Sequence, residues 1–155
     1  MSVLDASAVV ELLIGTELGR AVADRLEDPA IDLHAPHLLD VEVLQVLRRL
    51  VRDGSLTARD AAAALNDLRA LDVERHDHGP LLDRVWALRK NLTAYDAVYV
   101  ALAEALDTTL LTCDRKLARS PGLGRRIDVI GCSAKDADSS AGPPRTGRPR
   151  QPPRR

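Results

Sequence analysis

The chain contains few aromatic residues and few cysteines. Only 2% of its 155 residues are aromatic and none is Phe, so Leu, Val, Ile and Ala must fill the core. This scarcity disfavours nucleic-acid binding by stacked aromatic side chains. Cys113 and Cys132 are the only cysteines, and they form no CxxC motif. We therefore expect two reduced thiols in a cytosolic protein rather than a disulfide framework or a zinc knuckle.

Long apolar runs are also missing. No stretch approaches the ~18 apolar residues that a membrane-spanning helix needs. The N-terminus has no basic segment, and Asp5 and Glu11 interrupt its apolar residues, which is not typical of a secretory signal peptide. The sequence therefore predicts a cytoplasmic protein without a membrane partner.

Most of the chain lacks a surplus of positive charge. The net charge is −1, but residues 139–155 carry five arginines and no acid, which leaves 17 basic and 23 acidic residues, a net of −6, in residues 1–138. An acidic body argues against a protein that coats nucleic acid non-specifically. It is compatible with an acidic pocket that attracts phosphate once cations are bound.

The composition changes near residue 133. A chain of this length allows one domain with a core of its own. Five of the nine prolines come after residue 140, among Gly and Arg, and Ala is the only other apolar residue type from residue 133 onward. Such a segment cannot bury a core. We predict a single domain over residues 1–132 and a disordered Pro/Arg-rich tail over residues 133–155.

Short strand-like segments alternate with longer helical patterns within the domain. Strands are expected over residues 2–4, 31–34, 71–76, 109–112 and 127–130. Helices are expected over residues 6–14, 16–27, 37–52, 57–70, 80–89, 93–106 and 115–119. Strands separated by helices predict an α/β fold with a parallel central sheet flanked by helices.

Four acidic residues occupy positions where the local pattern favours apolar side chains. Asp5 and Asp114 each end an apolar strand, Glu42 has apolar helical neighbours, and Asp96 opens a nearly all-apolar helix. Ligands of α/β sheets bind outside the carboxyl ends of the strands, so these acids can meet there. Carboxylates that meet repel one another unless protons or cations lie between them. All-oxygen clusters suit Mg²⁺ or Mn²⁺.

Each acid also has a purely local explanation. Asp5 and Asp114 could cap the helices that follow them. The Thr93-x-x-Asp96 spacing fits a capping box, and Glu42 could reach water from the edge of its helix. Taken singly, these explanations are favoured. The common position of the acids at strand and helix ends favours a shared site.

The motifs around the acids resemble those of PIN domains, specifically of VapC-type toxins. The opening VLDASAVV at residues 3–10 resembles the start of that family. The segment YDAVYVALAE at residues 95–104 is similar to its third-acid helix, and LLTCD at residues 110–114 to its T-x-D strand end. Glu42, in DVEV at residues 40–43, is similar to the second acid, which favours it over Asp40. The resemblance covers roughly residues 2–131.

The resemblance implies a single PIN-like domain and a metal-dependent endoribonuclease, the toxin component of a type II toxin-antitoxin system. Asp5, Glu42, Asp96 and Asp114 would then be both catalytic and metal-binding, with Mg²⁺ or Mn²⁺ as the cofactor for phosphodiester hydrolysis. Ser7 or Thr112 could orient a ligand water, although a local backbone hydrogen bond is favoured for both hydroxyls.

The resemblance also implies partners: a cognate VapB-like antitoxin, an RNA substrate, a homodimer and a toxin-antitoxin hetero-oligomer. Some apolar side chains could line such surfaces, although burial in the core is favoured for them: Leu12, Leu13, Leu38 and Leu47. Basic side chains near the acids could guide an RNA backbone, although a solvated helix face is favoured for them: Arg48, Arg49, Arg52, Arg115 and Lys116.

Other interpretations remain open. A non-catalytic PIN-like module that binds nucleic acid or an antitoxin is the main alternative. A haloacid dehalogenase-type phosphatase would need a second acid two residues after Asp5, where this chain has Ser7. The histidines are expected in a loop and a charged turn at the solvated surface, because they form no helical pair: His34, His37, His76 and His78.

Overall fold

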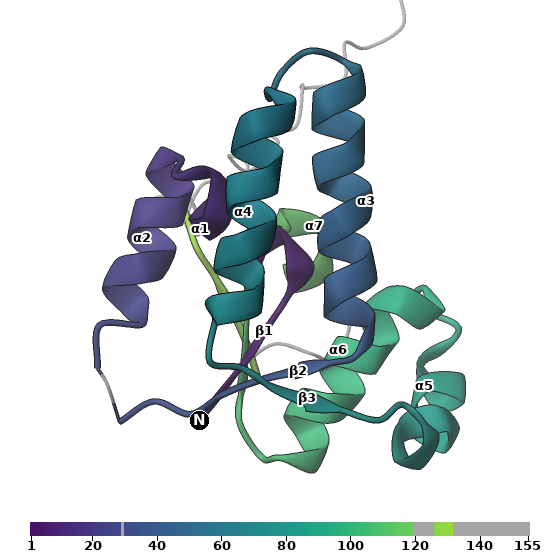
Figure 1. Ribbon diagram of the computed structural model, residues 1–155. Helices are drawn as coiled ribbons and strands as arrows, with labels where there is room; N and C mark the ends of the chain where they lie inside the picture. Colours follow the sequence, from purple (N-terminus) through teal and green to yellow (C-terminus); the bar gives the residue numbers. More distant parts are fainter. Residues whose placement is uncertain (29, 120–125, 132–155) are drawn as a thin grey trace, which may run out of the picture.

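The structure is a computed structural model, and it describes residues 1–28, 30–119 and 126–131 (Figure 1). The predicted tail over residues 133–155 lies outside the described residues, and so does Cys132. The domain boundary predicted at residue 132 therefore stays a prediction.

Five parallel strands form the central sheet, as the sequence predicts. They are β1 (Ser2–Leu4), β2 (Leu33–Pro36), β3 (Glu74–His76), β4 (Thr109–Thr112) and β5 (Ile127–Val129), in the order β3-β2-β1-β4-β5. β1 is central, with Val3 opposite both His34 and Leu110. The chain first builds the sheet outward from β1 through β2 to β3, and then adds β4 and β5 on the other side. The carboxyl ends of β1 and β4 therefore flank the position where the strand order reverses, which is where α/β sheets bind ligands.

Three of the helices begin directly after a capping threonine. The helices are α1 (Ala6–Ile14), α2 (Glu17–Arg25), α3 (Leu38–Arg52), α4 (Ala58–Ala70), the 3₁₀ turn η1 (Gly79–Leu81), α5 (Leu82–Leu88), α6 (Ala94–Ala105) and α7 (Arg115–Ala118). Thr16, Thr57 and Thr93 each accept a hydrogen bond from the backbone N–H three residues further on. The long helices α3 and α4 form a hairpin on one side of the strands, and α5 and α6 lie on the other side (Figure 1).

Helix α6 runs through the core. Every residue from Ala97 to Ala103 is buried, and the helix contacts β1, β2 and β4. A helix that is apolar on all sides has to be enclosed in this way. Asp96 lies one residue before the buried stretch, so the packing of α6 carries this acid to the sheet.

Helices α1 and α2 approach each other closely at Gly19. A Cβ atom at this position would overlap the backbone carbonyl of Glu11. Gly15 ends α1 with φ 70, a left-handed conformation that favours glycine, and its N–H bonds back to the helix. The chain can therefore reverse directly after α1.

The predicted β2 strand is displaced from its observed position. Residues 31–34 were expected, whereas the strand covers Leu33–Pro36, and His34 lies in it rather than in a loop. Pro36 lacks an N–H and disfavours an interior strand position, but it is tolerated as the last residue of β2. β3 is shorter than predicted, since Glu74 is its first residue.

The prediction that the histidines are solvated is wrong for three of them. His34 is 6% exposed, and His76 and His78 are half-buried; only His37 is exposed. Leu47 is buried in the core, as the favoured explanation for it requires, and Leu12, Leu13 and Leu38 are half-buried. In the described part of the chain, no helix is long and apolar enough to cross a membrane.

Candidate metal centre

Asp5 follows β1 directly, and its carboxylate is fixed by two hydroxyl groups. Its Oδ2 atom accepts hydrogen bonds from the Ser7 hydroxyl at 2.5 Å and from the Thr112 hydroxyl at 2.7 Å. The backbone of Asp5 occupies the N-cap position of α1, but its side chain makes no capping hydrogen bond. The capping explanation is therefore wrong for Asp5. Its carboxylate is oriented by side chains from α1 and β4 instead.

The hydroxyls of Ser7 and Thr112 also hold the turn after β4. Ser7 Oγ accepts from the backbone N–H of Cys113 and Thr112 Oγ1 from that of Asp114, each at 2.9 Å. The bond at Thr112 is a local backbone hydrogen bond, as favoured for it, whereas Ser7 binds the backbone of a residue far away in the sequence. In addition, each hydroxyl donates to Asp5. Two ordinary side chains thus couple the ends of β1 and β4.

Glu42 lies on α3, half-buried, and is held by a residue of α6. Its Oε2 atom accepts a hydrogen bond from the Tyr99 hydroxyl at 2.5 Å. Burial raises the pKa of Glu42, the nearby carboxylates of Asp5 and Asp96 raise it further, and the hydrogen bond from Tyr99 acts in the opposite direction. The pKa of Tyr99 is also raised, chiefly by its own burial and then by its bond to Glu42. Glu42 is therefore not a solvated charge at a helix edge.

Asp40, the alternative to Glu42, has a different partner. The Arg75 guanidinium donates to both of its carboxylate oxygens, at 2.9 Å from Nε and 2.9 Å from Nη2. This bidentate ion pair joins α3 to β3. Asp40 is thus neutralised by an arginine, whereas Glu42 is acted on by the charges of Asp5 and Asp96.

Asp114 caps α7, whereas the cap of α6 is Thr93 and not Asp96. The Thr93 hydroxyl accepts from the backbone N–H of Asp96 at 3.1 Å and donates to its Oδ2 at 2.7 Å. Asp114 Oδ1 accepts from the backbone N–H of Lys116 at 2.8 Å. The capping explanation is correct for Asp114. Only half of the predicted capping box is present at Asp96, because its carboxylate accepts from the hydroxyl of Thr93 and not from the Thr93 backbone N–H. The charge of Asp96 also acts on Glu42.

Three of the four acids are linked by electrostatics. Asp5, Glu42 and Asp96 come from the end of β1, from α3 and from α6, and the carboxylates of Asp5 and Asp96 both act on the carboxyl of Glu42. Asp114 is linked to Asp5 through its backbone, because its N–H donates to the Thr112 hydroxyl, which in turn donates to Asp5.

No basic side chain neutralises these acids within the described residues. Other carboxylates of the chain have arginine partners, such as Asp40 with Arg75 and Glu104 with Arg84. Over residues 1–28, 30–119 and 126–131, no ion pair links Lys or Arg to the four acids: Asp5, Glu42, Asp96 and Asp114. Like charges gathered without a basic partner provide a site whose chemistry suits a divalent cation.

Tyr99 is the residue of this group that the sequence motifs did not reveal. It is 1% exposed and lies three residues after Asp96, on the same side of α6. A buried Tyr hydroxyl requires a hydrogen-bond partner, which was the available signal. The identity of that partner, Glu42 at a sequence separation of 57 residues, depends on the tertiary structure.

The thiol of Cys113 is not a candidate nucleophile. Burial raises its pKa to about 11, and Glu11 and Asp5 raise it as well. The thiolate, which is the reactive form, is therefore scarce at neutral pH.

Comparison with known proteins identifies the family. A family model for the PIN domain matches residues 2–123. The chain belongs to the PIN-domain family. Ribonuclease VapC1 of Mycobacterium tuberculosis (strain ATCC 25618 / H37Rv) is 46% identical over 129 residues, which span 83% of this chain and 96% of VapC1. Ribonuclease VapC12 of the same strain is 39% identical over 130 residues, spanning 84% and 99% of the two chains.

Solved structures agree with this PIN assignment. The crystal structure of PAE2754 from Pyrobaculum aerophilum matches with a TM-score of 0.61 at 27% identity and covers 83% of each chain. That of Mycobacterium tuberculosis VapC20, described as a sarcin-ricin loop cleaving toxin, matches with a TM-score of 0.59 at 13% identity, over 76% of this chain and 93% of VapC20. The second likeness shows the fold alone. The expected PIN-like fold and its resemblance to VapC-type toxins are confirmed.

Proposed function

We propose that this PIN-domain chain is a metal-dependent endoribonuclease, the toxin component of a type II toxin-antitoxin system. The observation that supports the proposal is that the carboxylates of Asp5 and Asp96, which come from two other elements, both act electrostatically on the half-buried carboxyl of Glu42. The relatives named as VapC ribonucleases supply the class of substrate. A phosphodiester bond in RNA is then the bond that is hydrolysed.

The donor set fits Mg²⁺ or Mn²⁺. All four proposed ligand side chains offer carboxylate oxygens only, which hard divalent cations prefer. They are Asp5, Glu42, Asp96 and Asp114, and we assign catalysis to the same four. A bound ion supplies an activated water and neutralises charge on the scissile phosphate. The contribution of the chain is orientation: Ser7 and Thr112 fix Asp5, and Tyr99 fixes Glu42.

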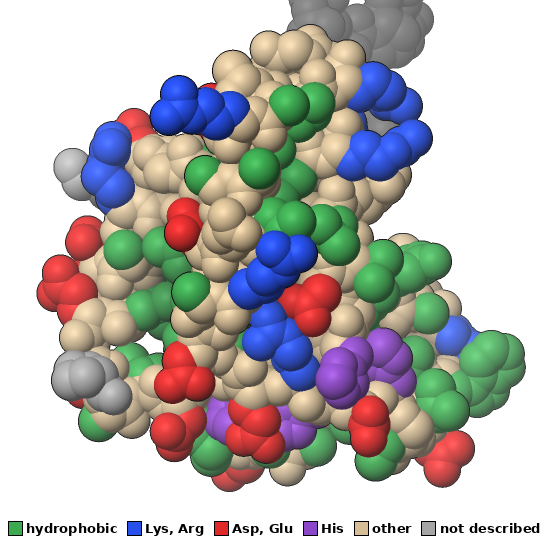
Figure 2. Space-filling model, in the orientation of Figure 1, with side chains coloured by type: hydrophobic (Ala, Val, Ile, Leu, Met, Phe, Trp, Pro, Cys, Tyr) green, Lys and Arg blue, Asp and Glu red, His purple; other side chains and the backbone are tan. Residues whose placement is uncertain are grey.

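Basic side chains near the acids support an RNA substrate. Arg48, Arg49 and Arg52 are exposed on the helix that carries Glu42. Lys and Arg side chains gather along the far end of α3 (Figure 2). Arg115 and Lys116 are exposed directly after Asp114. Contacts of such residues with phosphates would position the RNA backbone while the carboxylates perform the chemistry.

An apolar groove beside Glu42 supports a protein partner. It is lined by side chains of α3 together with one of α6: Leu38, Val41, Glu42, Leu44, Gln45, Val46, Arg48 and Tyr95. Val41 and Tyr95 are 63% and 62% exposed, unusually open for large hydrophobic residues. A VapB-like antitoxin, a second copy of this chain in a homodimer, and a toxin-antitoxin hetero-oligomer are the partners we propose for such surfaces, in the cytoplasm.

The test is RNA cleavage by the purified chain free of antitoxin. Mixed cellular RNA is incubated with the protein and Mg²⁺, Mn²⁺ or EDTA in parallel, and Asp96→Asn is the matched variant. Asn is nearly isosteric and keeps an oxygen that can accept from Thr93. We expect cleavage that requires metal and is lost in Asp96→Asn. Absence of cleavage by folded, metal-loaded wild type across structured RNAs would contradict the proposal and support a non-catalytic binding module.

A further inference from the structure

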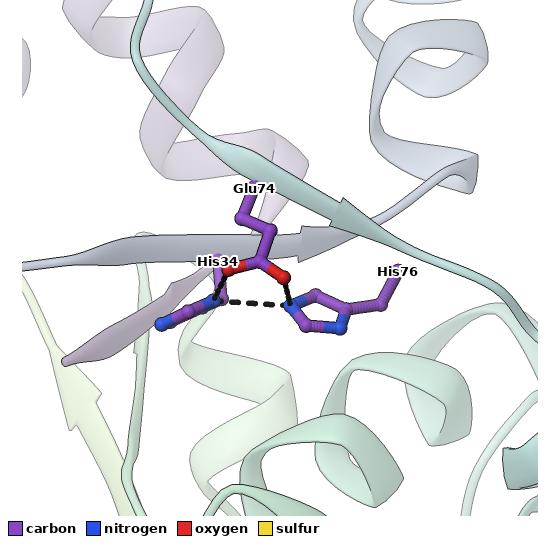
Figure 3. A group of neighbouring side chains, drawn as sticks. All are labelled: His34, Glu74 and His76. Carbon is purple, nitrogen blue, oxygen red and sulfur yellow. Dashed lines mark hydrogen bonds and ion pairs between the residues drawn. The ribbon is translucent and has the colours of Figure 1, made fainter.

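Three side chains of metal-ligand type meet on one face of the edge strand β3 and its neighbour β2 (Figure 3). His34 on β2 lies opposite Glu74 on β3, and His76 follows two residues later on β3. Alternate residues of a strand project from the same face, so this register directs all three side chains to one point. Their ligand atoms lie within 4.8 Å of one another.

The separations within this group are those of ligand atoms around one ion, and only the contact between the two imidazole rings has the length of an ordinary hydrogen bond. His34 Nδ1 lies 3.0 Å from His76 Nε2, while Glu74 Oε2 lies 3.5 Å from His34 Nδ1 and Glu74 Oε1 lies 3.8 Å from His76 Nε2. The two carboxylate contacts exceed ordinary hydrogen-bond lengths. Ligand atoms bound tetrahedrally to zinc at about 2.0–2.1 Å are roughly 3.3–3.4 Å apart, in the middle of the observed range.

Burial decreases across the group and leaves one side open. The His34 side chain is 7% exposed, that of His76 22%, and that of Glu74 67%. Nε2 of His34 is buried and has no hydrogen-bond partner among the described residues, so the polar contacts of this ring are all at Nδ1, toward the group. An ion can enter from the side of Glu74, where water can complete its shell.

The backbone around the group is held by independent contacts. The carbonyl of His76 accepts from the backbone N–H of His37 at 3.0 Å. On the opposite face of β3, Arg75 binds Asp40 and donates to the backbone carbonyl of Val73 at 2.9 Å. Ligands on paired strands keep their geometry better than ligands on loops.

We propose that His34 Nδ1, His76 Nε2 and the Glu74 carboxylate form a binding site for Zn²⁺, with water as a fourth ligand. Two imidazoles and one carboxylate suit a borderline cation such as zinc and differ from the oxygen-only set of the four acids. Because β3 pairs only with β2, the ion would cross-link an edge strand to the sheet. The proposal is independent of the nuclease activity.

The test is calorimetric titration of Zn²⁺ into the untagged chain after treatment with chelator. We expect one zinc ion per wild-type chain, and a reduction in affinity of at least about 10- to 100-fold, the loss typical of an outer-shell partner, in Glu74→Gln and His76→Gln. Glu74 is exposed, so its substitution leaves folding intact. His37→Gln is the control, since His37 faces Asp77 at 3.5 Å as an exposed histidine-carboxylate pair outside the group.

Two further readouts complete the experiment. Zinc should raise the melting temperature of the wild type and not of Glu74→Gln, since an ion that binds the folded state stabilises it. Asp96→Asn should bind zinc as the wild type does. Failure of the wild type to bind zinc, wild-type affinity in Glu74→Gln, or loss of binding in Asp96→Asn would each overturn the site.

Discussion

The molecule presents two polar groups on one sheet, and they are built differently. The acid group, consisting of Asp5, Glu42, Asp96 and Asp114, includes the residues that directly follow β1 and β4 and contains oxygen donors only. The histidine group, consisting of His34, Glu74 and His76, lies on one face of the edge strand β3 and its neighbour β2 and contains two nitrogen donors. Asp5 and Glu42 are oriented by hydroxyl groups from other elements, while the histidine group relies on strand register. Donor chemistry thus predicts a hard cation for catalysis in one group and a borderline cation for structure in the other.

The largest expected effect is on RNA cleavage, when one carboxylate of the acid group is replaced by an amide. Asp5→Asn should lower RNA cleavage by at least about 100-fold, as for other losses of a charge-stabilising group. Folding should be retained, because Asn keeps an oxygen that accepts from Ser7 and Thr112. The measurement is the single-turnover cleavage rate at saturating Mg²⁺.

Asp40→Asn is the matched control for Asp5→Asn. It breaks the bidentate pair with Arg75 and should lower the free energy of unfolding by roughly 1–2 kcal/mol. Cleavage by the folded fraction should be unchanged. Equal cleavage by Asp5→Asn and wild type, or loss of cleavage in folded Asp40→Asn, would reverse the roles assigned to the two aspartates.

The next effect concerns the hydroxyl that joins Asp5 to the turn after β4. Thr112→Val removes the donor to Asp5 and the acceptor for the Asp114 N–H, and Thr112 is fully buried. We expect a loss of about 1–3 kcal/mol in the free energy of unfolding. Cleavage should fall by about 10-fold, the lower end of the range for groups that position others.

Denaturant titration and the cleavage assay measure the two effects of Thr112→Val. Thr108→Val is the control, because the Thr108 hydroxyl bonds the Met1 carbonyl at the surface, away from the acids. If Thr112→Val lost stability yet kept full activity, the hydroxyl would stabilise the turn after β4 without positioning Asp5 for cleavage.

A smaller effect is expected from the hydrogen bond that holds Glu42. Tyr99→Phe removes this bond, and hydrogen bonds to charged groups contribute roughly 1.5–3 kcal/mol. The Mg²⁺ concentration for half-maximal cleavage should rise about 10-fold, while the rate at saturating metal changes less. Tyr95→Phe, on the exposed start of α6, should leave the metal dependence unchanged. A purely structural Tyr99 would lower stability without moving the metal titration.

The smallest expected effect is on the pH dependence of folding stability. The pKa of Glu42 in the folded chain is raised above its ordinary value of 4.5, so ionisation costs more in the folded than in the unfolded state. The ionised side chain therefore destabilises the metal-free protein at pH 7, and this cost disappears below about pH 4.5. Glu42→Gln should raise the melting temperature at pH 7 by less than about 4 °C, because solvent screens a half-buried group.

The measurement is the melting temperature of Glu42→Gln and of wild type, without metal, at pH values from 7 to 4. The difference should shrink as the pH falls. A difference in melting temperature that is constant with pH would show that folding does not raise the pKa of Glu42.

Local sequence patterns predicted most of the fold and much of the acid group. Thr16, Thr57 and Thr93 marked the starts of their helices, and the predicted bounds of β1, α1 and β4 agree with the structure. Asp5 and Asp114 were recognisable because they directly follow apolar strands. In each case the determining interactions lie within a few residues along the chain.

What the sequence did not reveal depends on long-range pairing. The bond between Tyr99 and Glu42 joins residues on different helices. The histidine group exists because β2 pairs with β3 in a register that sets His34 opposite Glu74, and no local pattern specifies that register. Pro36 also made the end of β2 hard to predict, since proline in an apolar segment usually indicates a break.

Electron paramagnetic resonance of bound Mn²⁺ tests most directly whether the four acids hold the catalytic cation. Coupling of the bound ion to nitrogen nuclei reports histidine ligands, and the spectrum is compared among wild type, Asp5→Asn and His76→Gln. The account predicts bound Mn²⁺ without nitrogen coupling in the wild type, loss of this signal in Asp5→Asn, and no change in His76→Gln. Nitrogen coupling that disappears in His76→Gln, with binding intact in Asp5→Asn, would contradict it.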